Sequence, residues 1–293
     1  MVIIVLIKER GRFPSVFYRL VAIFGVQEVI CYLFNQYIQR WPTSEFVYIH
    51  YFYQLQIPTK IQVVWYFVYF YTQLQGVLAA TILAFNRVSC ILFPMHHDTM
   101  WRKNLPLVLA IYYVAPFGCY WTLLFNKGVV ECDNGTGMDK QCYFTYDHSN
   151  TFGISVGNNS KYAFISLSVI SGVCNFTTLF LLCLRKKSLR IRRNWKQEIN
   201  LFITSFVIFL AHFAYGLVEQ TVPAFYRTSK TASTLIFGVI LPLLYDVVLA
   251  STVLSLIIAS PKIRQEILYI FGEPFGLNVT RQTKTVTMSP SKF

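Results

Sequence analysis

The chain has 293 residues, of which 55% are hydrophobic and 17% aromatic, while only 13% are charged. A soluble domain carries about 25% charged residues, so this composition excludes a single soluble core and indicates repeated crossings of a lipid bilayer. The formal net charge of +13 does not indicate nucleic-acid binding, because the Lys and Arg residues lie between apolar runs and not on one clustered basic face.

The first apolar run, residues 2–7, is too short to cross a bilayer and is followed at once by three basic residues. A secretory signal peptide has the opposite order, with its charge before the apolar core. We therefore interpret residues 1–7 as the remnant of a first helix whose beginning is absent from this sequence.

Six further apolar runs are long enough to cross about 30 Å of hydrocarbon. They predict an all-α membrane protein, a seven-transmembrane-helix bundle with a truncated first helix and six complete spans. Residues 8–271 would form this bundle, with a surface helix at 261–271 whose Ile263, Ile267 and Ile270 share one face, and residues 272–293 a cytoplasmic tail. The predicted spans are residues 20–38, 61–85, 105–125, 162–184, 199–218 and 235–258.

Lys and Arg counts on alternate sides of the spans predict the orientation. One set of connections, which includes residues 86–103 and 185–196, holds eighteen of them, and the other set holds seven. Since the side with the excess is cytoplasmic, the chain should place its C-terminus in the cytoplasm. The glycosylation sequons at Asn134 and Asn158 lie in the 126–161 loop, on the outer side, whereas those at Asn175 and Asn278 should stay unused.

Cysteine and histidine patterns indicate no metal or cofactor site. Cys132 and Cys142 lie in the polar loop without CxxC partners, which favours a local extracellular disulfide over a metal site. The run from His96 to Asp98 lacks the ligand spacing of a closed zinc site. We interpret it as interfacial polar residues at a helix end.

One motif invites an enzymatic interpretation. Gly153-Ile-Ser-Val-Gly157 matches the nucleophile-elbow pattern. That chemistry needs the Ser on a sharp strand-to-helix turn, but here it lies in a loop just before a predicted membrane helix. We therefore expect a flexible glycine loop and no enzyme.

Three ionisable residues lie within predicted spans, namely Glu28, His212 and Asp246. Such groups are costly at the bilayer midplane, so they should face the bundle interior and are candidates for a functional site. They could form a polar network that a receptor rearranges on activation, bind ions or protons in a small secondary transporter, or make a structural hydrogen bond between helices.

Two segments are candidates for contact with a cytoplasmic partner. Asn86 and Arg87 stand at the end of the predicted 61–85 span, and the basic segment 185–198 contains Arg190, Arg192 and Arg193 between apolar residues. Such a surface would suit an acidic, GTP-binding protein, although its basic residues also serve as an anchor to anionic lipid.

Three stretches carry a family resemblance. They are Phe-Asn-Arg-Val-Ser-Cys-Ile-Leu-Phe-Pro (residues 85–94) with Trp101 downstream, Phe17-Tyr18-Arg19-Leu20, and Ser260-Pro-Lys-Ile-Arg264. The chain resembles nematode serpentine receptors, most closely the gamma class, with the V class similar.

The resemblance implies a seven-helix chemoreceptor of the G-protein-coupled type, in the plasma membrane of sensory cilia, that detects an environmental small molecule and couples to a heterotrimeric G protein. Rhodopsin-like receptors carry an acidic residue before the Arg that Arg87 would match. Here Asn86 takes that place, so a local ionic lock is not expected. We expect the ligand pocket to be lined by the aromatic runs 65–71 and 112–121.

The parity of six complete spans generates a prediction about topology. The protein as written should insert with both ends on the cytoplasmic side. An epitope tag at Met1 should therefore stay inaccessible to antibody on intact cells and become accessible on permeabilised cells. A tag detected on the intact cell surface would contradict this topology.

Overall fold

The computed structural model describes residues 16–40, 59–132, 142–146, 156–191, 195–228, 236–259, 263–265 and 267. The predicted first-helix remnant and the tail lie outside these ranges, as do the sequons at Asn134 and Asn278. Of the predicted surface helix, Ile263 and Ile267 are described and lie in helical backbone; Ile263 is buried against the bundle core.

Within the described ranges, five helices are long and apolar enough to cross a membrane, and a further apolar helix is shorter. The predicted all-α membrane architecture is thus observed. In chain order the helices are α2 (Val16–Asn35) continued by the π-helical turn η1 (Gln36–Arg40), α4 (Lys60–Leu92), α5 (His97–Tyr120) continued by the 3-10 turn η4 (Trp121–Phe125), α6 (Val156–Ile191), α7 (Trp195–Thr228), and η7 (Ile236–Ile240) leading into α9 (Leu241–Ala259).

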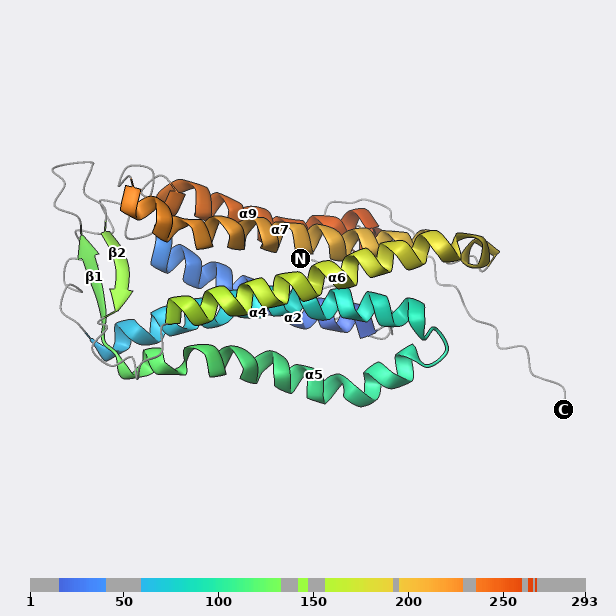
Figure 1. Ribbon diagram of the computed structural model, residues 1–293, viewed down its shortest axis with the longest axis horizontal. Helices are drawn as coiled ribbons and strands as arrows, with labels where there is room; N and C mark the ends of the chain where they lie inside the picture. Colours follow the sequence, from blue (N-terminus) through green and yellow to red (C-terminus); the bar gives the residue numbers. More distant parts are fainter. Residues whose placement is uncertain are drawn as a thin grey trace, which may run out of the picture.

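The helices lie lengthwise beside one another, so the bundle has two distinct ends (Figure 1). A small antiparallel hairpin of β1 (Gly128–Cys132) and β2 (Cys142–Tyr146) lies at one end, with Cys132 and Cys142 opposite each other in the register. The turn between α4 and α5 lies at the other end. We call these the hairpin end and the turn end. The hairpin falls within the predicted polar loop 126–161, for which no strand was predicted.

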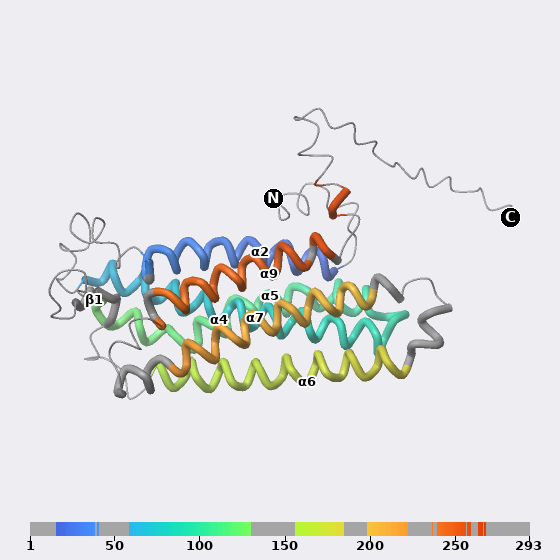
Figure 2. Tube along the Cα trace, turned by 90° about the horizontal axis from the view of Figure 1, so that it is seen from above, coloured from blue at the N-terminus to red at the C-terminus, as the bar shows by residue number. Residues whose placement is uncertain are grey.

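Helix α4 is the central helix of the bundle. It contacts α2, α5, α6 and α7, and Figure 2 shows it between α2 on one side and α6 on the other. In the most apolar stretch of α4, 83% of residues are buried, compared with 28% in α5 and 33% in α6. Since lipid covers exposed apolar faces, α5 and α6 form the outer wall and α4 carries the groups hidden from lipid.

Local sequence explains where α4 begins and ends. The side chain of Thr59 caps the first turn by accepting a hydrogen bond from the Gln62 amide at 3.4 Å. At the other end Phe93 precedes Pro94, and a residue before proline is disfavoured in helical conformation. The helix thus ends at Leu92. It extends beyond the predicted limit at residue 85 and includes Asn86 and Arg87.

Helix α5 begins earlier than predicted, at His97, and passes through Pro106 and Pro116. A proline inside a helix removes one backbone N–H, so the carbonyl four residues earlier loses its usual partner. For Pro116 that carbonyl belongs to Tyr112, and Gln75 of α4 donates to it at 3.5 Å. A polar side chain of the central helix thus compensates a break in its neighbour.

The basic segment 185–198 is largely helical, which differs from the predicted loop. Helix α6 continues to Ile191 and α7 begins at Trp195. Helix α7 also runs beyond the predicted limit at residue 218, so Glu219 lies on a helix of the bundle.

A glycine permits the closest approach between α6 and α7. A Cβ atom on Gly216 of α7 would lie 1.9 Å from Cε2 of Phe164 of α6. A side chain at residue 216 would therefore have to move the Phe164 ring or the helix. The two helices can pack at this separation because Gly216 has no side chain.

The contact at Gly216 generates a stability prediction. Gly216→Ala should lower the free energy of unfolding by about 1 to 3 kcal/mol, because it overpacks the α6–α7 interface. Thermal unfolding of the purified protein in detergent measures the change. Gly118→Ala is the matched control, since nothing lies within 4 Å of its Cβ position. Equal unfolding temperatures for the two variants would contradict this account of the interface.

Candidate functional site

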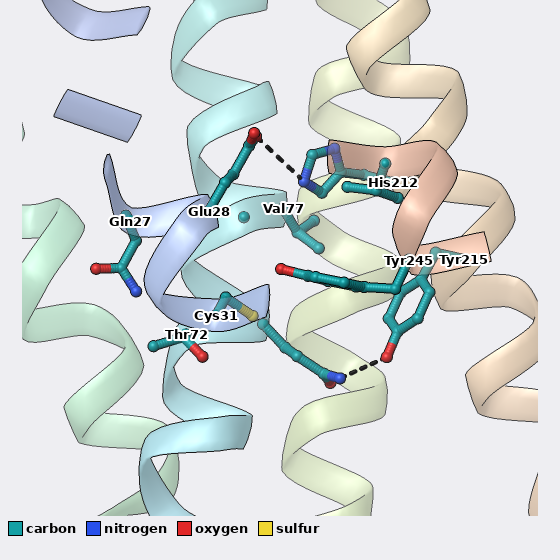
Figure 3. Close-up of a pocket in the computed structure, with 11 residues that line it drawn as sticks. Gln27, Glu28, Cys31, Thr72, Val77, His212, Tyr215 and Tyr245 are labelled. Atoms are coloured by element: carbon teal, nitrogen blue, oxygen red, sulfur yellow. Dashed lines mark hydrogen bonds and ion pairs between the residues drawn. The ribbon is translucent and has the colours of Figure 1, made fainter. Parts of the chain in front are cut away.

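Among the buried polar side chains of the described residues, two clusters contain ionisable groups. The first surrounds a cavity between α2, α4, α7 and α9, which we call the central cavity (Figure 3). It encloses about 20 Å³, room for about one water-sized group. The groups that line it include Glu28 and Cys31 of α2, Thr72 and Gly76 of α4, His212 and Tyr215 of α7, and Tyr245 and Val248 of α9.

Glu28 and His212 face each other across this cavity (Figure 3). Both side chains are buried, and Nε2 of the imidazole lies 4.0 Å from Oε1 of the carboxyl group. The Thr252 hydroxyl of α9 donates to the same carboxyl oxygen at 3.1 Å. Two of the three predicted intramembrane polar residues are therefore brought together. Thr252, which was not predicted, forms a hydrogen bond with Glu28.

A second set of polar groups lies on the side of the cavity toward the hairpin end. The Gln73 side chain lies 2.5 Å from the Tyr215 hydroxyl. With its amide oriented to satisfy all neighbours, its oxygen accepts from Tyr69 and Tyr215, and its nitrogen donates to Glu219 Oε1 at 2.7 Å. Helices α4 and α7 are thus joined by a hydrogen-bonded chain that ends in an acid.

Gly76 permits the approach of His212. A Cβ atom at this position would lie 2.9 Å from Nε2 of the imidazole. Any other residue would displace the ring from the cavity, so the small residue of α4 and the polar residue of α7 depend on each other.

Asp246 lies apart from Glu28 and His212. Its carboxylate accepts a hydrogen bond from Arg40 at 2.5 Å, and both side chains are about one-third exposed. The neighbouring residue Tyr245 lines the cavity instead. The three-member network that the sequence suggested is therefore two-membered in the structure, and Asp246 joins α9 to the end of α2.

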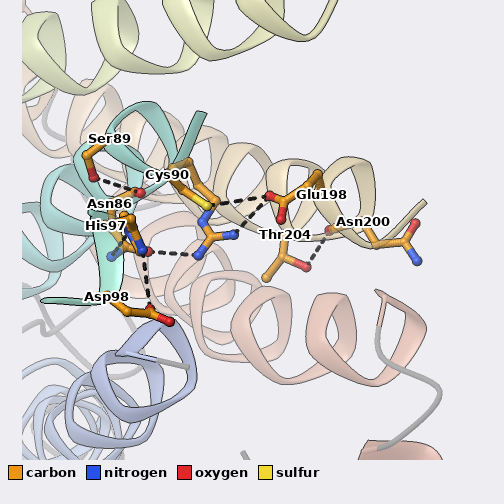
Figure 4. Close-up of polar contacts among 9 residues, drawn as sticks. Asn86, Ser89, Cys90, His97, Asp98, Glu198, Asn200 and Thr204 are labelled. Atoms are coloured by element: carbon orange, nitrogen blue, oxygen red, sulfur yellow. Dashed lines mark hydrogen bonds and ion pairs between the residues drawn. The ribbon is translucent and has the colours of Figure 1, made fainter. Parts of the chain in front are cut away.

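The second cluster lies at the turn end and surrounds Arg87, whose neighbours Asn86 and Glu198 are labelled in Figure 4. The guanidinium is 3% exposed and lies 3.7 Å from Oε2 of Glu198, the first acidic residue of α7. It also donates to Asn86 Oδ1 at 2.8 Å and lies 4.1 Å from the centre of the Phe17 ring. Helices α2, α4 and α7 thus meet at one buried cation. We call this group the Arg87 cluster.

The turn after α4 is fixed by the same segment. Asn86 Nδ2 lies 3.2 Å from His97 Nε2, so the end of α4 is tied to the start of α5. Trp101 is buried and donates its indole N–H to Ser89 Oγ at 2.8 Å. The Asn, Arg and Trp of the family-like stretch therefore form one compact unit.

Several predicted site residues cannot be placed in either cluster. Arg190 lies in the last turn of α6, and only its backbone is described, while Arg192 and Arg193 lie outside the described residues. Asn158 lies in the first turn of α6 at the hairpin end. Cys132 and Cys142 are described as backbone only, as opposite positions of β1 and β2.

Some residues of the aromatic runs expected to line a pocket make ring contacts with other helices. Trp65 contacts Phe34, with 5.1 Å between ring centres, and Phe70 contacts Tyr120 at 5.7 Å. Neither run contributes a residue to the wall of the central cavity. The described residues that line the cavity include Glu28, Gln73 and His212.

Sequence reasoning missed two acidic residues. Neither Glu198, the last residue of the basic segment 185–198, nor Glu219, just beyond the predicted 199–218 span, is among the predicted site residues. A signal for the first did exist, because Glu198 is the sole acidic residue of the basic segment 185–198 and lies on the same side as Arg87. Glu219 was missed because the apolar run ends at residue 218, whereas helix α7 continues through Pro223 to Thr228.

Comparisons with known proteins agree on one family. A sequence model described as Srg family chemoreceptor matches residues 1–267. Serpentine receptor class gamma-13 of Caenorhabditis elegans is 25% identical over 202 residues, which cover 68% of this chain and 55% of that protein. Serpentine receptor class gamma-11 of the same organism is 26% identical over 195 residues, which cover 65% and 53%. The chain thus spans about half the length of these relatives. The resemblance to nematode serpentine receptors is confirmed.

The buried Trp101 contact generates a prediction for the turn. Trp101→Phe and Ser89→Ala should each lower the free energy of unfolding by about 1 kcal/mol, because each removes the same buried hydrogen bond. In the double variant the two losses should not add, since the bond can be lost only once. Chemical unfolding of the four proteins in one detergent measures this. Fully additive losses would show that the two side chains do not interact.

Proposed function

Because the chain belongs to the Srg family of chemoreceptors, we propose that it is a G-protein-coupled chemosensory receptor that detects an environmental small molecule. The ligand acts at the central cavity. The G protein binds at the turn end, where Asn86, Arg87 and the basic segment 185–198 lie. The family match and the multi-pass helical bundle support the receptor class, and the coupling is our inference.

One observation carries the proposal: the same two helices bear both polar clusters. Helix α4 contributes Gly76 to the central cavity and Arg87 to the Arg87 cluster, while α7 contributes His212 and Glu198. A ligand that favours a different spacing of α4 and α7 at the cavity would therefore change the distance between Arg87 and Glu198. Such a shared element is what coupling between two sites requires.

The ion pair suits a resting state. Neither neighbour of Arg87 in the sequence is acidic. The carboxylate comes from Glu198 of α7, whose Oε2 lies 3.7 Å from the guanidinium. We propose that this contact holds the turn ends of α4 and α7 together without ligand and separates on activation, which would uncover a surface for the G protein.

The proposed membrane orientation places the turn end and the C-terminus in the cytoplasm. The excess of Lys and Arg on that side supports it. The protein would lie in the plasma membrane of a sensory cilium with a seven-helix plan, as the resemblance implies. Asn134 and Asn158 would then be extracellular glycosylation sites, and Cys132 and Cys142 would form a disulfide, which their opposite positions in the hairpin register support.

The transport hypothesis is not favoured. The matching family and the relatives are chemoreceptors. In addition, Asp246, one of the three residues on which that hypothesis depended, pairs with Arg40 away from the cavity.

The proposal predicts the effect of breaking the ion pair. Glu198→Gln should raise ligand-independent signalling about fivefold, because loss of a contact worth about 1 kcal/mol shifts a two-state equilibrium by about that factor. A second-messenger assay in cells that express the chain with a G protein measures this at equal surface expression. Asp98→Asn is the matched control, an exposed acid at the same end that contacts His97. Unchanged basal signalling in Glu198→Gln would contradict the proposed resting role.

A further inference from the structure

The central cavity presents two hydrogen-bond acceptors to each other. His212 Nδ1 lies 2.9 Å from the carbonyl oxygen of Ile208. A carbonyl can only accept, so Nδ1 carries the hydrogen, and in the neutral ring Nε2 then offers a lone pair. That lone pair lies 4.0 Å from Glu28 Oε1, which is too far for a direct hydrogen bond. The complement of this pair is a group with at least two N–H or O–H donors.

The charge around the cavity selects among such donors. Glu28 lines it, and Glu219 lies beyond Gln73. None of the described residues that line the cavity is Lys or Arg, and Arg40 is held by Asp246. A buried carboxylate is strongly disfavoured unless a cation or donors offset its lost hydration. A cationic ligand gains from this environment, whereas a carboxylate or phosphate ligand is repelled.

The size and walls of the cavity favour an organic cation over a hydrated metal ion. Its volume of about 20 Å³ is room for one water-sized group, such as an –NH₃⁺ head group. Beside the polar atoms, the wall contains the ring of Tyr245, which packs against that of Tyr215 with 5.4 Å between centres. Aromatic faces attract ammonium groups, and the apolar side chain of Val77 suits the adjoining carbon.

We propose that the central cavity binds the ammonium head group of a small amine, which donates to both Glu28 Oε1 and His212 Nε2. The ligand class of the receptor is then an amine. This assignment of an agonist rests on the proposed function, whereas the binding itself does not. Because its two partners lie on α2 and α7, the bound head group links these helices beside Gly76 of α4.

The test uses three small probes of two or three non-hydrogen atoms and different charge: methylammonium, methanol and formate. A ligand of two non-hydrogen atoms binds no more tightly than about millimolar, so each is added at about 0.1 M to the purified chain in lipid nanodiscs at constant ionic strength. Methylammonium should raise the unfolding temperature by about 3 °C relative to KCl. Methanol, formate and NaCl should not raise it.

Two variants locate the binding. Glu28→Gln keeps an oxygen that can accept from Thr252 but removes the charge, and it should abolish the methylammonium shift. Gly76→Ala fills the space beside His212 and should do the same. Asp98→Asn and Gly118→Ala are the matched controls, an acid and a glycine outside the cavity, and both should keep the wild-type shift.

Several results would overturn the proposal. They are equal stabilisation by methanol, a shift that persists in Glu28→Gln, no shift in the wild type, or a Glu28-dependent shift with NaCl, which would assign the site to a metal ion. None of these results bears on signalling through Glu198. In the converse case, methylammonium stabilises the wild type while Glu198→Gln leaves basal signalling unchanged. That pair of results would support the amine site and refute the proposed receptor mechanism.

Discussion

A buried guanidinium is the constraint on which the turn end of the bundle depends. Arg87 is a permanent cation on the most buried helix, and an unpaired charge there would destabilise the fold by several kcal/mol. It is accommodated by Asn86 on its own helix, the Phe17 ring of α2 and the carboxylate of Glu198 on α7. The three helices therefore meet where their polar and aromatic groups surround one cation. The stretches that carry the family resemblance gather around the same place, since Phe17, Trp101 and Ile263 belong to one core cluster.

The central cavity follows the same rule at mid-height. A carboxyl group on α2 and an imidazole on α7 avoid lipid by facing inward, and Gly76 leaves the space that they need. Helices α4 and α7 run the length of the bundle and contribute to both clusters. In the proposed mechanism, a change in their spacing at the cavity would accompany a change in the contact between Arg87 and Glu198. Helices α5 and α6 are mostly exposed and provide the lipid-facing wall.

The sequence predicted the helices well because each depends on a long apolar run, which is a local property. It also singled out Glu28 and His212, because ionisable residues are rare in such runs, and Arg87, because it stands where the 61–85 run ends. The structure buries all three side chains in the bundle. Which groups pair could not be predicted, since pairing depends on helix rotation. Asp246 shows this: neighbouring residues on a helix point about 100° apart, so with Tyr245 toward the cavity, Asp246 turns toward Arg40. Glu198 was missed because the basic segment was expected to be a loop, and the hairpin because its strands are short and its pairing is not local.

The most direct test of the account is the coupling energy between Arg87 and Glu198. It is obtained from the free energies of unfolding of the wild type, Arg87→Gln, Glu198→Gln and the double variant, measured in one lipid environment. If the carboxylate of α7 offsets the buried cation of α4, the losses should fall short of additivity by about 1 kcal/mol or more. Losses that add to within about 0.5 kcal/mol would show that the two helices are not joined by this pair.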